Sequence, residues 1–300
     1  MASYYGERQC ASVKNNKQCS NKAYFLGILS GTLLCGVHSR KIDKEILPKN
    51  PNKKQIEEDL RKKRKEDTIL SASENAKNGQ PGDIILYKMK MMKPIDYKHG
   101  YMNVFPNYRH EMPELSPKSI GPIVHGQPGL PIALNLENFH QGNKVFPDEI
   151  DSSGNILNSF YETQIAFYND PVPHRHKPNA TGNIPVCSIW TLKTGEKKRI
   201  SYFESRQFYC TYYERTVKNE RAYAKLHELH QMGFNLQICG YDAYPVGSNS
   251  NSNSNSNSDS SLEECYLDTT RPFGHELVLY SMLVLNPENY PWRKYTTFDF

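Results

Sequence analysis

Residues 220–242 read ERAYAKLHELHQMGFNLQICGYD, and this stretch decides the fold class. Glu220–Met232 has the pattern of a helix, and Gly233 follows as the left-handed residue that commonly ends one. Asn235–Cys239 is a short apolar run typical of a buried strand, with Asp242 just after it. A helix joined through one glycine to a buried strand predicts a domain that mixes helices and strands.

The segments on either side continue this alternation. Ser201–Lys218 is expected to form a helix, and Ile84–Tyr87 is a short apolar run near the start of the large domain. Beyond the strand, the turn Pro272–Gly274 introduces an apolar helix expected at Glu276–Leu285. We therefore predict an α+β domain over residues 81–300.

A repetitive tract interrupts this domain. Residues 247–261 read GSNSNSNSNSNSDSS, which contains no large apolar side chain. Such a segment cannot bury enough surface to offset the entropy lost on ordering. We expect a disordered insertion at a surface loop, after which the domain resumes.

Two further zones precede the large domain. Residues 1–40 hold a cluster of Cys and His, and residues 41–80 are rich in Lys, Glu and Asn. Within the second zone Gln55–Asp67 is expected to be a charged helix without an apolar stripe, which is typical of a linker.

The N-terminal cluster has the spacing of a metal site. Its candidate ligands follow the pattern Cys-x8-Cys-x15-Cys-x2-His and are Cys10, Cys19, Cys35 and His38. Zinc takes four such ligands in a tetrahedron, and a close Cys-x2-His pair supplies two from one turn. Four protein ligands leave no open position, so the predicted Zn²⁺ is structural.

This module resembles short zinc-knuckle-like modules found in proteins of large DNA viruses and elsewhere. The resemblance covers residues 8–40 and rests on the metal ligands together with Lys14, Lys17 and Ala23. Basic residues around the site, namely Arg8, Lys14, Lys17 and Lys22, could contact nucleic acid, and docking onto a protein is equally open.

The composition of the chain limits its size class, its location and its charge. The chain has 300 residues, 37% of them hydrophobic, so it can bury at least one sizeable core. No apolar stretch is long enough for a membrane span, and nothing resembles a signal peptide. Seven Cys, four of them scattered singly through the large domain, indicate reduced thiols and an intracellular protein. The net charge of +5 is mild, and the oligomeric state stays open.

The candidate for chemistry lies at residues 136–146, LENFHQGNKVF. If Glu137–Lys144 is helical, then Glu137, Gln141 and Lys144 share one face. A carboxylate, an amide and an ammonium on one wall can activate a water or stabilise an oxocarbenium-like centre. The competing interpretation is an amphipathic helix whose Glu137 and Lys144 face solvent.

These residues resemble the NADAR family, whose members include N-glycosidases acting on ribosylated bases and on riboflavin-pathway intermediates. The family's core helix carries Glu-x3-Gln-x2-Lys followed by an aromatic, matched here by Glu137, Gln141, Lys144 and Phe146, with Ser116 in the loop before it. A second family element places an Asp before Trp-Gly and an apolar helix; Asp268 and Phe273-Gly274 resemble it, with Leu279, Met282 and Leu283 in the helix. Phe273 replaces the family Trp, and His275-Glu276 replaces a Gly/Asn-rich stretch.

The resemblance implies an N-glycosidase acting on a nucleotide or ADP-ribose derivative. It implies that Glu137 activates water or steadies the ribosyl cation, that Lys144 holds this carboxylate or a phosphate, and that Asp268 orients the sugar. Ser116, Gln141, Arg206, Asp242 and His275 are the candidate substrate-binding residues. Asp242 is included because open sheets bind ligands at the carboxyl ends of their strands, and His275 because it precedes a helix start that favours phosphate.

Other interpretations stay open. Aromatic residues beside Arg206 at helical spacing usually belong to a core, and a less common interpretation has Arg206 stacking with a Tyr on a nucleobase. His174 and His176 flank Arg175 in a Pro-bracketed segment that favours a positioned loop over a metal site. At the level of the whole chain, the rival is a non-catalytic adaptor that binds nucleic acid or a protein. The Ser-Asn repeat resembles proteins of giant DNA viruses, which implies host cytoplasm or the virion, and a virion component is a third possibility.

Overall fold

The structure is a computed structural model that describes residues 53–91, 95–107, 112–177, 184–246 and 261–300, together with short strands and a turn residue within the first 46 residues. The chain divides into two compact units, Met1–Glu66 and Asp67–Phe300. Each unit is described by itself.

The first unit contains a short hairpin and a small antiparallel sheet. The hairpin pairs β1 (Val13–Lys14) with β2 (Lys17–Gln18), and both strands lie between the first two candidate zinc ligands in the sequence. The sheet has the order β4-β3-β5, formed by β3 (Phe25–Gly27), β4 (Leu33–Leu34) and β5 (Lys44–Ile46). The predicted ligands Cys10, Cys19, Cys35 and His38 lie outside the described residues.

Helix α1 (Lys53–Lys77) is longer than the sequence predicts and continues ten residues past Asp67. Its last turns belong to the second unit, where Thr68 and Ala72 are buried. Asn75 Nδ2 donates hydrogen bonds to the carbonyl of Gly233 at 2.8 Å and to Oδ1 of Asn235 at 2.9 Å. The boundary of the large domain therefore lies at Asp67, within the segment that the sequence assigned to a linker.

The second unit contains a three-stranded parallel sheet. Its order is β6-β11-β7, formed by β6 (Ile84–Lys88), β11 (Asn235–Gly240) and β7 (Tyr101–Val104). The central strand is buried because its apolar side chains are covered on both sides, and Leu236 and Ile238 are fully enclosed. Gly233 has a φ of 91°, the left-handed conformation expected at this helix end.

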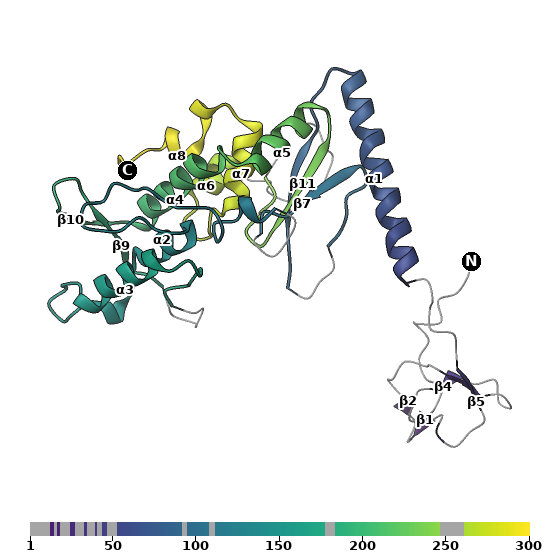
Figure 1. The fold of residues 1–300 in the computed structure, drawn as a ribbon, viewed down its shortest axis with the longest axis horizontal. Coiled ribbons are helices and arrows are strands. Elements are labelled where there is room, and N and C mark those ends of the chain that lie inside the picture. The colour runs from purple at the N-terminus through teal and green to yellow at the C-terminus, as the bar shows by residue number, and fades with distance from the viewer. Residues whose placement is uncertain are drawn as a thin grey trace. The chain divides into compact units, whose positions relative to one another are not determined.

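A second sheet is antiparallel, with the order β10-β9-β8. Its strands are β8 (Lys144–Val145), β9 (Cys187–Thr191) and β10 (Lys197–Ile200). Figure 1 shows α2 (Leu136–Gly142) and α3 (Asn158–Asn169) at this end of the unit, with α4 (Tyr202–Val217) and α7 (His275–Val284) between the two sheets. This mixture of helices and strands confirms the α+β prediction.

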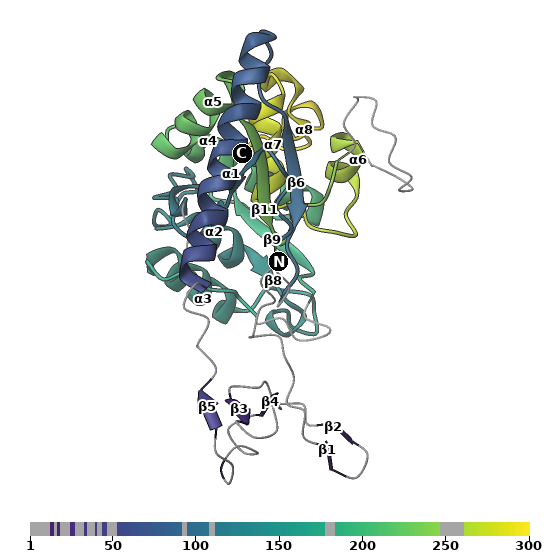
Figure 2. The same ribbon diagram turned by 90° about the vertical axis from the view of Figure 1, so that its right-hand side faces the viewer.

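The helices predicted at Ser201–Lys218, Glu220–Met232 and Glu276–Leu285 are confirmed to within one residue at each end. Helix α4 begins at a capping box, in which Glu204 N donates to Ser201 Oγ and Ser201 N donates to Glu204 Oε2. Helix α5 (Arg221–Gln231) precedes β11, and α7 begins at His275. Figure 2 shows β6 and β11 side by side, and α7 packs against both strands.

The Ser-Asn tract ends in an ordered residue. Ser261 Oγ accepts a hydrogen bond from Glu264 N and thereby caps α6 (Leu262–Leu267), so the prediction of disorder is wrong at position 261. Residues 247–260 lie outside the described part. The remaining short helices are Pro113–Leu115, Pro147–Glu149, Pro287–Asn289 and α8 (Pro291–Lys294).

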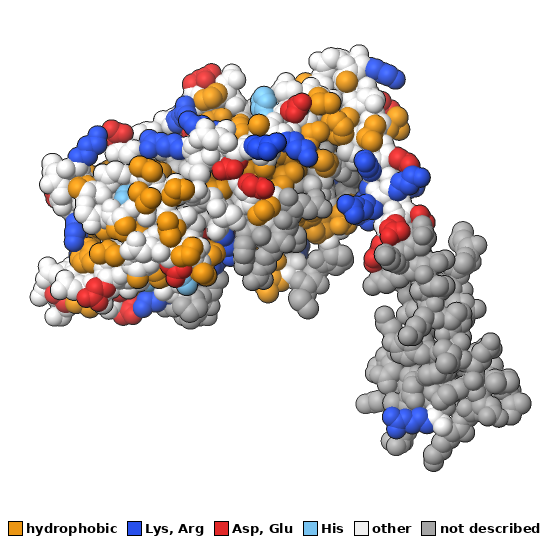
Figure 3. Space-filling view, viewed as in Figure 1, with side chains coloured by type: hydrophobic (Ala, Val, Ile, Leu, Met, Phe, Trp, Pro, Cys, Tyr) orange, Lys and Arg blue, Asp and Glu red, His pale blue; other side chains and the backbone are white. Residues whose placement is uncertain are grey.

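Aromatic side chains dominate the core of the second unit. Phe139 of α2 packs edge-on against Phe208 and Tyr212 of α4, with ring centroids 5.4 and 5.0 Å away, and against Trp190 of β9 at 6.1 Å. Figure 3 shows further apolar side chains spread over one face between Lys and Arg. In the part of the chain that is described, no helix has both the length and the apolar character to cross a membrane.

Candidate functional site

A cavity of about 470 Å³ opens beyond the carboxyl ends of the parallel strands. Asp242, just past β11, and Pro106, just past β7, both line it. Helices α2, α4 and α7 contribute further lining residues, and loops between the elements supply much of the rest. This is the position at which open parallel sheets commonly bind ligands.

The cavity brings together seven residues that the sequence singled out from distant segments. They are Ser116, Glu137, Gln141, Lys144, Arg206, Asp242 and His275. Asp268 does not line the cavity. Its Oδ1 accepts hydrogen bonds from N and Oγ1 of Thr270, and its Oδ2 lies 2.8 Å from Nε of Arg271, so its side chain shapes the local turn.

Glu137, Gln141 and Lys144 form one side of the cavity, which we call the α2 wall. Lys144 Nζ donates to Gln141 Oε1 at 3.3 Å, and Gln141 Nε2 donates to Glu137 Oε1 at 3.1 Å. Helix α2 ends at Gly142, so Lys144 lies on β8, and the prediction of one helix through Lys144 is wrong. The three side chains still share a wall because the chain turns directly from the helix into the strand.

The start of α2 is fixed by backbone contacts with the loop that carries Ser116. Glu137 N donates to the carbonyl of Pro117 at 2.8 Å, and Leu136 N donates to that of Ile120 at 3.0 Å. Asn135 caps the helix by accepting from Asn138 N. These contacts fix the backbone at Glu137, whose carboxylate lines the cavity and accepts a hydrogen bond from Gln141 Nε2.

Burial changes the proton affinity of the basic groups on this wall. It lowers the pKa of Lys144 to about 8, against the opposing attraction of Glu137 and with a smaller contribution from Arg175 in the same direction. Burial also lowers the pKa of His140, and the charge of Lys144 adds to that effect. His140 is therefore a neutral imidazole at physiological pH, and its ring packs 4.8 Å from the ring of Tyr209.

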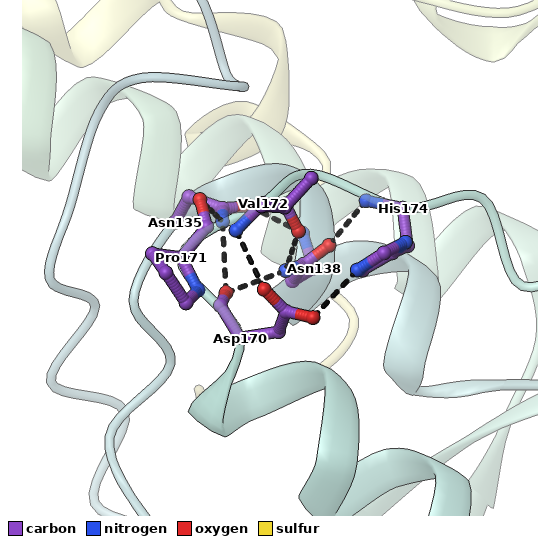
Figure 4. A network of polar contacts seen from close by, with 6 residues as sticks. All are labelled: Asn135, Asn138, Asp170, Pro171, Val172 and His174. Atoms are coloured by element: carbon purple, nitrogen blue, oxygen red, sulfur yellow. Dashed lines mark hydrogen bonds and ion pairs between the residues drawn. The ribbon is translucent and has the colours of Figure 1, made fainter.

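A loop carrying Arg175 is tied to the outer side of α2 (Figure 4). Asn138 Nδ2 donates to the carbonyls of Asp170 and Val172, both at 2.8 Å, and its Oδ1 accepts from His174 N at 2.6 Å. The side chain of Asp170 in turn accepts from Val172 N and pairs with His174 Nε2. This network holds the loop in place, and Arg175 beyond it lines the cavity.

His174 and His176 have separate partners. His176 Nε2 lies 2.5 Å from Glu149 Oε1, and its Nδ1 lies 3.1 Å from the carbonyl of Gln141. This agrees with the positioned loop that the sequence favours. Within the described ranges, no group of three or more His, Cys, Asp or Glu residues is placed to hold a metal ion.

Helix α4 contributes Tyr202, Arg206 and Tyr209, which lie at i, i+4 and i+7 and face the cavity together. The Arg206 guanidinium is buried, and it donates to the carbonyls of Tyr266, Asp268 and Arg271. Its donors are thus largely used in holding residues 266–271, and its Nε has no partner among the described residues. Arg206 therefore shapes the wall of the cavity and adds positive charge to it.

Asp242 and Glu276 lie together beside Gly274 in the cavity lining, and we call this part the carboxylate wall. Burial raises the pKa of Asp242, and the neighbouring charge of Glu276 raises it further. Glu276 is 3% exposed, and its Oε2 accepts no hydrogen bond from the residues that are described. His275 Nε2 lies 2.7 Å from the carbonyl of Pro106, which fixes the imidazole at the helix start.

Sequence reasoning missed several lining residues, including Glu276, His140 and Tyr209. Tyr209 is one of the aromatic residues of the Arg206 helix, and its spacing from Tyr202 and Arg206 is the signal that places it on their face. Glu276 was noted as a departure from the family pattern, and no local signal links it to Asp242 because the two belong to separate segments.

No protein-family model matches this chain, and neither the curated proteins nor the solved structures compared with it include a match. The case for function therefore rests on the cavity and on the motif resemblance.

Proposed function

We propose that this protein is an NADAR-like N-glycosidase that hydrolyses an N-glycosidic bond in a nucleotide or ADP-ribose derivative. The observation that carries the proposal is that the hydrogen-bonded residues of the α2 wall, Glu137, Gln141 and Lys144, line the same cavity as Asp242. Glycoside-cleaving sites need a positioned carboxylate beside an oxocarbenium-like centre, and the carboxylates of Glu137, Asp242 and Glu276 line this cavity.

Glu137 is the proposed catalytic carboxylate. The C1′–N bond breaks with its electron pair moving to nitrogen, and positive charge develops on the ribosyl ring beside Glu137. Water adds its oxygen to C1′ and gives a proton to Glu137, and Glu137 passes this proton to the departing nitrogen, so the carboxylate is regenerated. Gln141 and Lys144 hold the carboxylate in place and so reduce the cost of orienting it.

Asp242 takes the sugar-orienting role that the sequence assigned to Asp268. Asp268 lies outside the cavity lining, whereas Asp242 lies within it at the end of the central strand. The other lining groups suit a nucleotide. Lys118, Lys144 and Arg175 are cations for phosphate oxygens, and Tyr202, Tyr209 and Phe273 offer aromatic surface for a base.

The test is turnover of candidate substrates by the purified full chain. The panel contains ADP-ribosylated nucleic acid and aminouracil ribotides, with release of the free base followed by chromatography. Glu137→Gln should lower kcat by at least about 100-fold because it removes both the base and the negative charge. Glu162→Gln, on the exposed side of α3, is the matched control and should turn over like wild type. Equal turnover by wild type and Glu137→Gln would refute the assignment.

We also propose that the N-terminal unit binds one structural Zn²⁺ through Cys10, Cys19, Cys35 and His38. The support is the ligand spacing and the hairpin that precedes Cys19 in the sequence. Elemental analysis of the full chain should give one zinc per chain, and Cys35→Ser should lose it. Retention of stoichiometric zinc by Cys35→Ser would exclude this ligand set.

A further inference from the structure

We propose that Glu276, together with Asp242, binds the vicinal 2′- and 3′-hydroxyls of the ribosyl group and makes the site specific for ribose over 2′-deoxyribose. This inference rests on the proposed function, since it names the part of the substrate that the carboxylate wall recognises. Glu276 is the specificity-determining residue in this proposal.

One carboxylate oxygen of Glu276, Oε2, is a buried acceptor without a hydrogen-bond donor among the described residues. Glu276 is 3% exposed and lines the cavity, yet its Oε2 accepts no hydrogen bond from the described residues. Nδ1 of His275 lies 3.3 Å from this oxygen, and the ring's other nitrogen already contacts the carbonyl of Pro106. Leaving a buried carboxylate oxygen unpaired is costly, so a ligand that donates to it is favoured.

The backbone leaves room for this carboxylate. A Cβ at Gly240 would lie 1.9 Å from Glu276 Oε1, and a Cβ at Gly274 would lie 2.7 Å from Oε2. The same Cβ at Gly274 would lie 2.6 Å from the Asp242 Cβ and 3.4 Å from its Oδ2. The two acidic side chains thus lie against one glycine, and both reach the cavity.

The chemistry of the pair selects a neutral ligand with two adjacent donors. Ionised carboxylates only accept hydrogen bonds, so an anion such as phosphate is repelled at this wall. A cationic ligand would meet Lys118, Lys144, Arg175 and Arg206 in the same cavity. A metal ion is disfavoured because the described residues contain no group of three or more suitable ligands.

A vicinal diol fits these requirements. Its two hydroxyls each donate one hydrogen bond, and acidic side chains commonly accept from ribose hydroxyls in nucleotide sites. Two neighbouring carboxylates can each take one hydroxyl. Removing the 2′-hydroxyl would leave one buried carboxylate without its donor. The site therefore discriminates against 2′-deoxyribose more strongly than it could by the loss of an apolar contact.

The test measures binding to the full chain by calorimetry. The probes are ADP-ribose and the analogue, here called 2′-deoxy-ADP-ribose, whose terminal ribose lacks the 2′-hydroxyl. Wild type should bind the ribose form at least about tenfold more tightly, the worth of one charge-assisted hydrogen bond. Glu276→Gln and Glu276→Asp should reduce this ratio to near one, the first by removing the charge and the second by withdrawing it. Asp268→Asn, outside the cavity, should keep the wild-type ratio. Thermal melts establish that each variant is folded.

The outcomes separate this inference from the proposed function. Equal binding of the two probes by wild type, no binding of either, or an unchanged ratio in a folded Glu276→Gln would overturn the diol assignment. A wild-type preference that is lost in the Glu276 variants supports it. If that preference is present while no N-glycoside is hydrolysed, the hydrolase proposal fails and the diol site stands.

Discussion

The two walls of the cavity differ in how their polar groups are satisfied. On the α2 wall, Lys144 donates to Gln141 and Gln141 donates to Glu137, so the groups hold one another before any ligand arrives. On the carboxylate wall, Asp242 and Glu276 are close enough for one charge to raise the pKa of the other. The first wall is preorganised, whereas the second holds electrostatic repulsion that a donating ligand relieves.

The largest effect on stability should come from removing the support of the α2 wall. Asn138→Leu takes away the partners of two carbonyls and one amide in the loop that leads to Arg175. These groups are only partly buried, and the Asp170 carbonyl also accepts from Asn135 Nδ2 at 3.4 Å. An unpaired buried group costs ~1–3 kcal/mol, so for these groups we expect a loss of about 2 kcal/mol in the free energy of unfolding.

Urea denaturation measures this loss. Asn169→Leu is the matched control, because Asn169 is exposed and donates only within its own helix. A change below about 1 kcal/mol in Asn138→Leu would mean that the loop is held by other contacts.

The next-largest effect should be on turnover, when the hydrogen bonds within the α2 wall are broken. Gln141→Leu removes the donor to Glu137 and the acceptor of Lys144, and the Glu137 carboxylate then loses its fixed orientation. We expect kcat to fall about 10- to 100-fold with little change in KM, since these hydrogen bonds orient the carboxylate that acts at the reacting centre. Steady-state kinetics with the substrate identified by the Glu137 test measure it. A rise in KM at constant kcat would show that Gln141 serves binding alone.

The pH dependence of turnover sharpens the comparison further. The pKa of Lys144 is about 8 because burial disfavours its charge, so the ammonium is lost as pH rises through that value. We expect activity to fall above about pH 8. The Lys144→Met variant should turn substrate over slowly and should not show this fall in activity with pH.

The same shift affects stability with the opposite sign. Between the folded pKa of about 8 and the ordinary value of 10.5, the unfolded chain binds more protons at Lys144, so its contribution to stability rises with pH.

A wild-type activity profile flat from pH 7 to 10 would contradict the role given to this lysine.

The smallest effect should appear on the carboxylate wall. The pKa of Asp242 is raised in the folded chain, so its charged form weakens the fold and this penalty grows as pH rises through the folded pKa. Asp242→Asn should therefore raise the melting temperature slightly at pH 7, and the gain should vanish at acidic pH. Asp148→Asn is a control of opposite sign, because Lys177 lowers the pKa of Asp148. A lower melting temperature in Asp242→Asn would mean that its carboxylate is stabilised in the fold.

The elements of the large domain could be predicted wherever local rules dominate. The glycine after α5, the capping residue of α4 and the apolar run of β11 each have a local signature, and their bounds agree with the structure. Helix α1 was predicted too short because its last turns are stabilised by contacts with Gly233 and Asn235. Lys144 was assigned to α2 because the helical spacing gives no sign of the turn into β8.

The sequence by itself determined the alternation of helices and strands and the spacing that puts Glu137 and Gln141 on one face, because both depend on groups within one or two turns. The tertiary structure decided which acid faces them. Asp268 had the better motif position, but Asp242 lies at the end of the central strand beside the start of α7. That neighbourhood, with Glu276 against Gly240 and Gly274, forms because α7 packs on the sheet, and the intervening Ser-Asn tract gives no local sign of it.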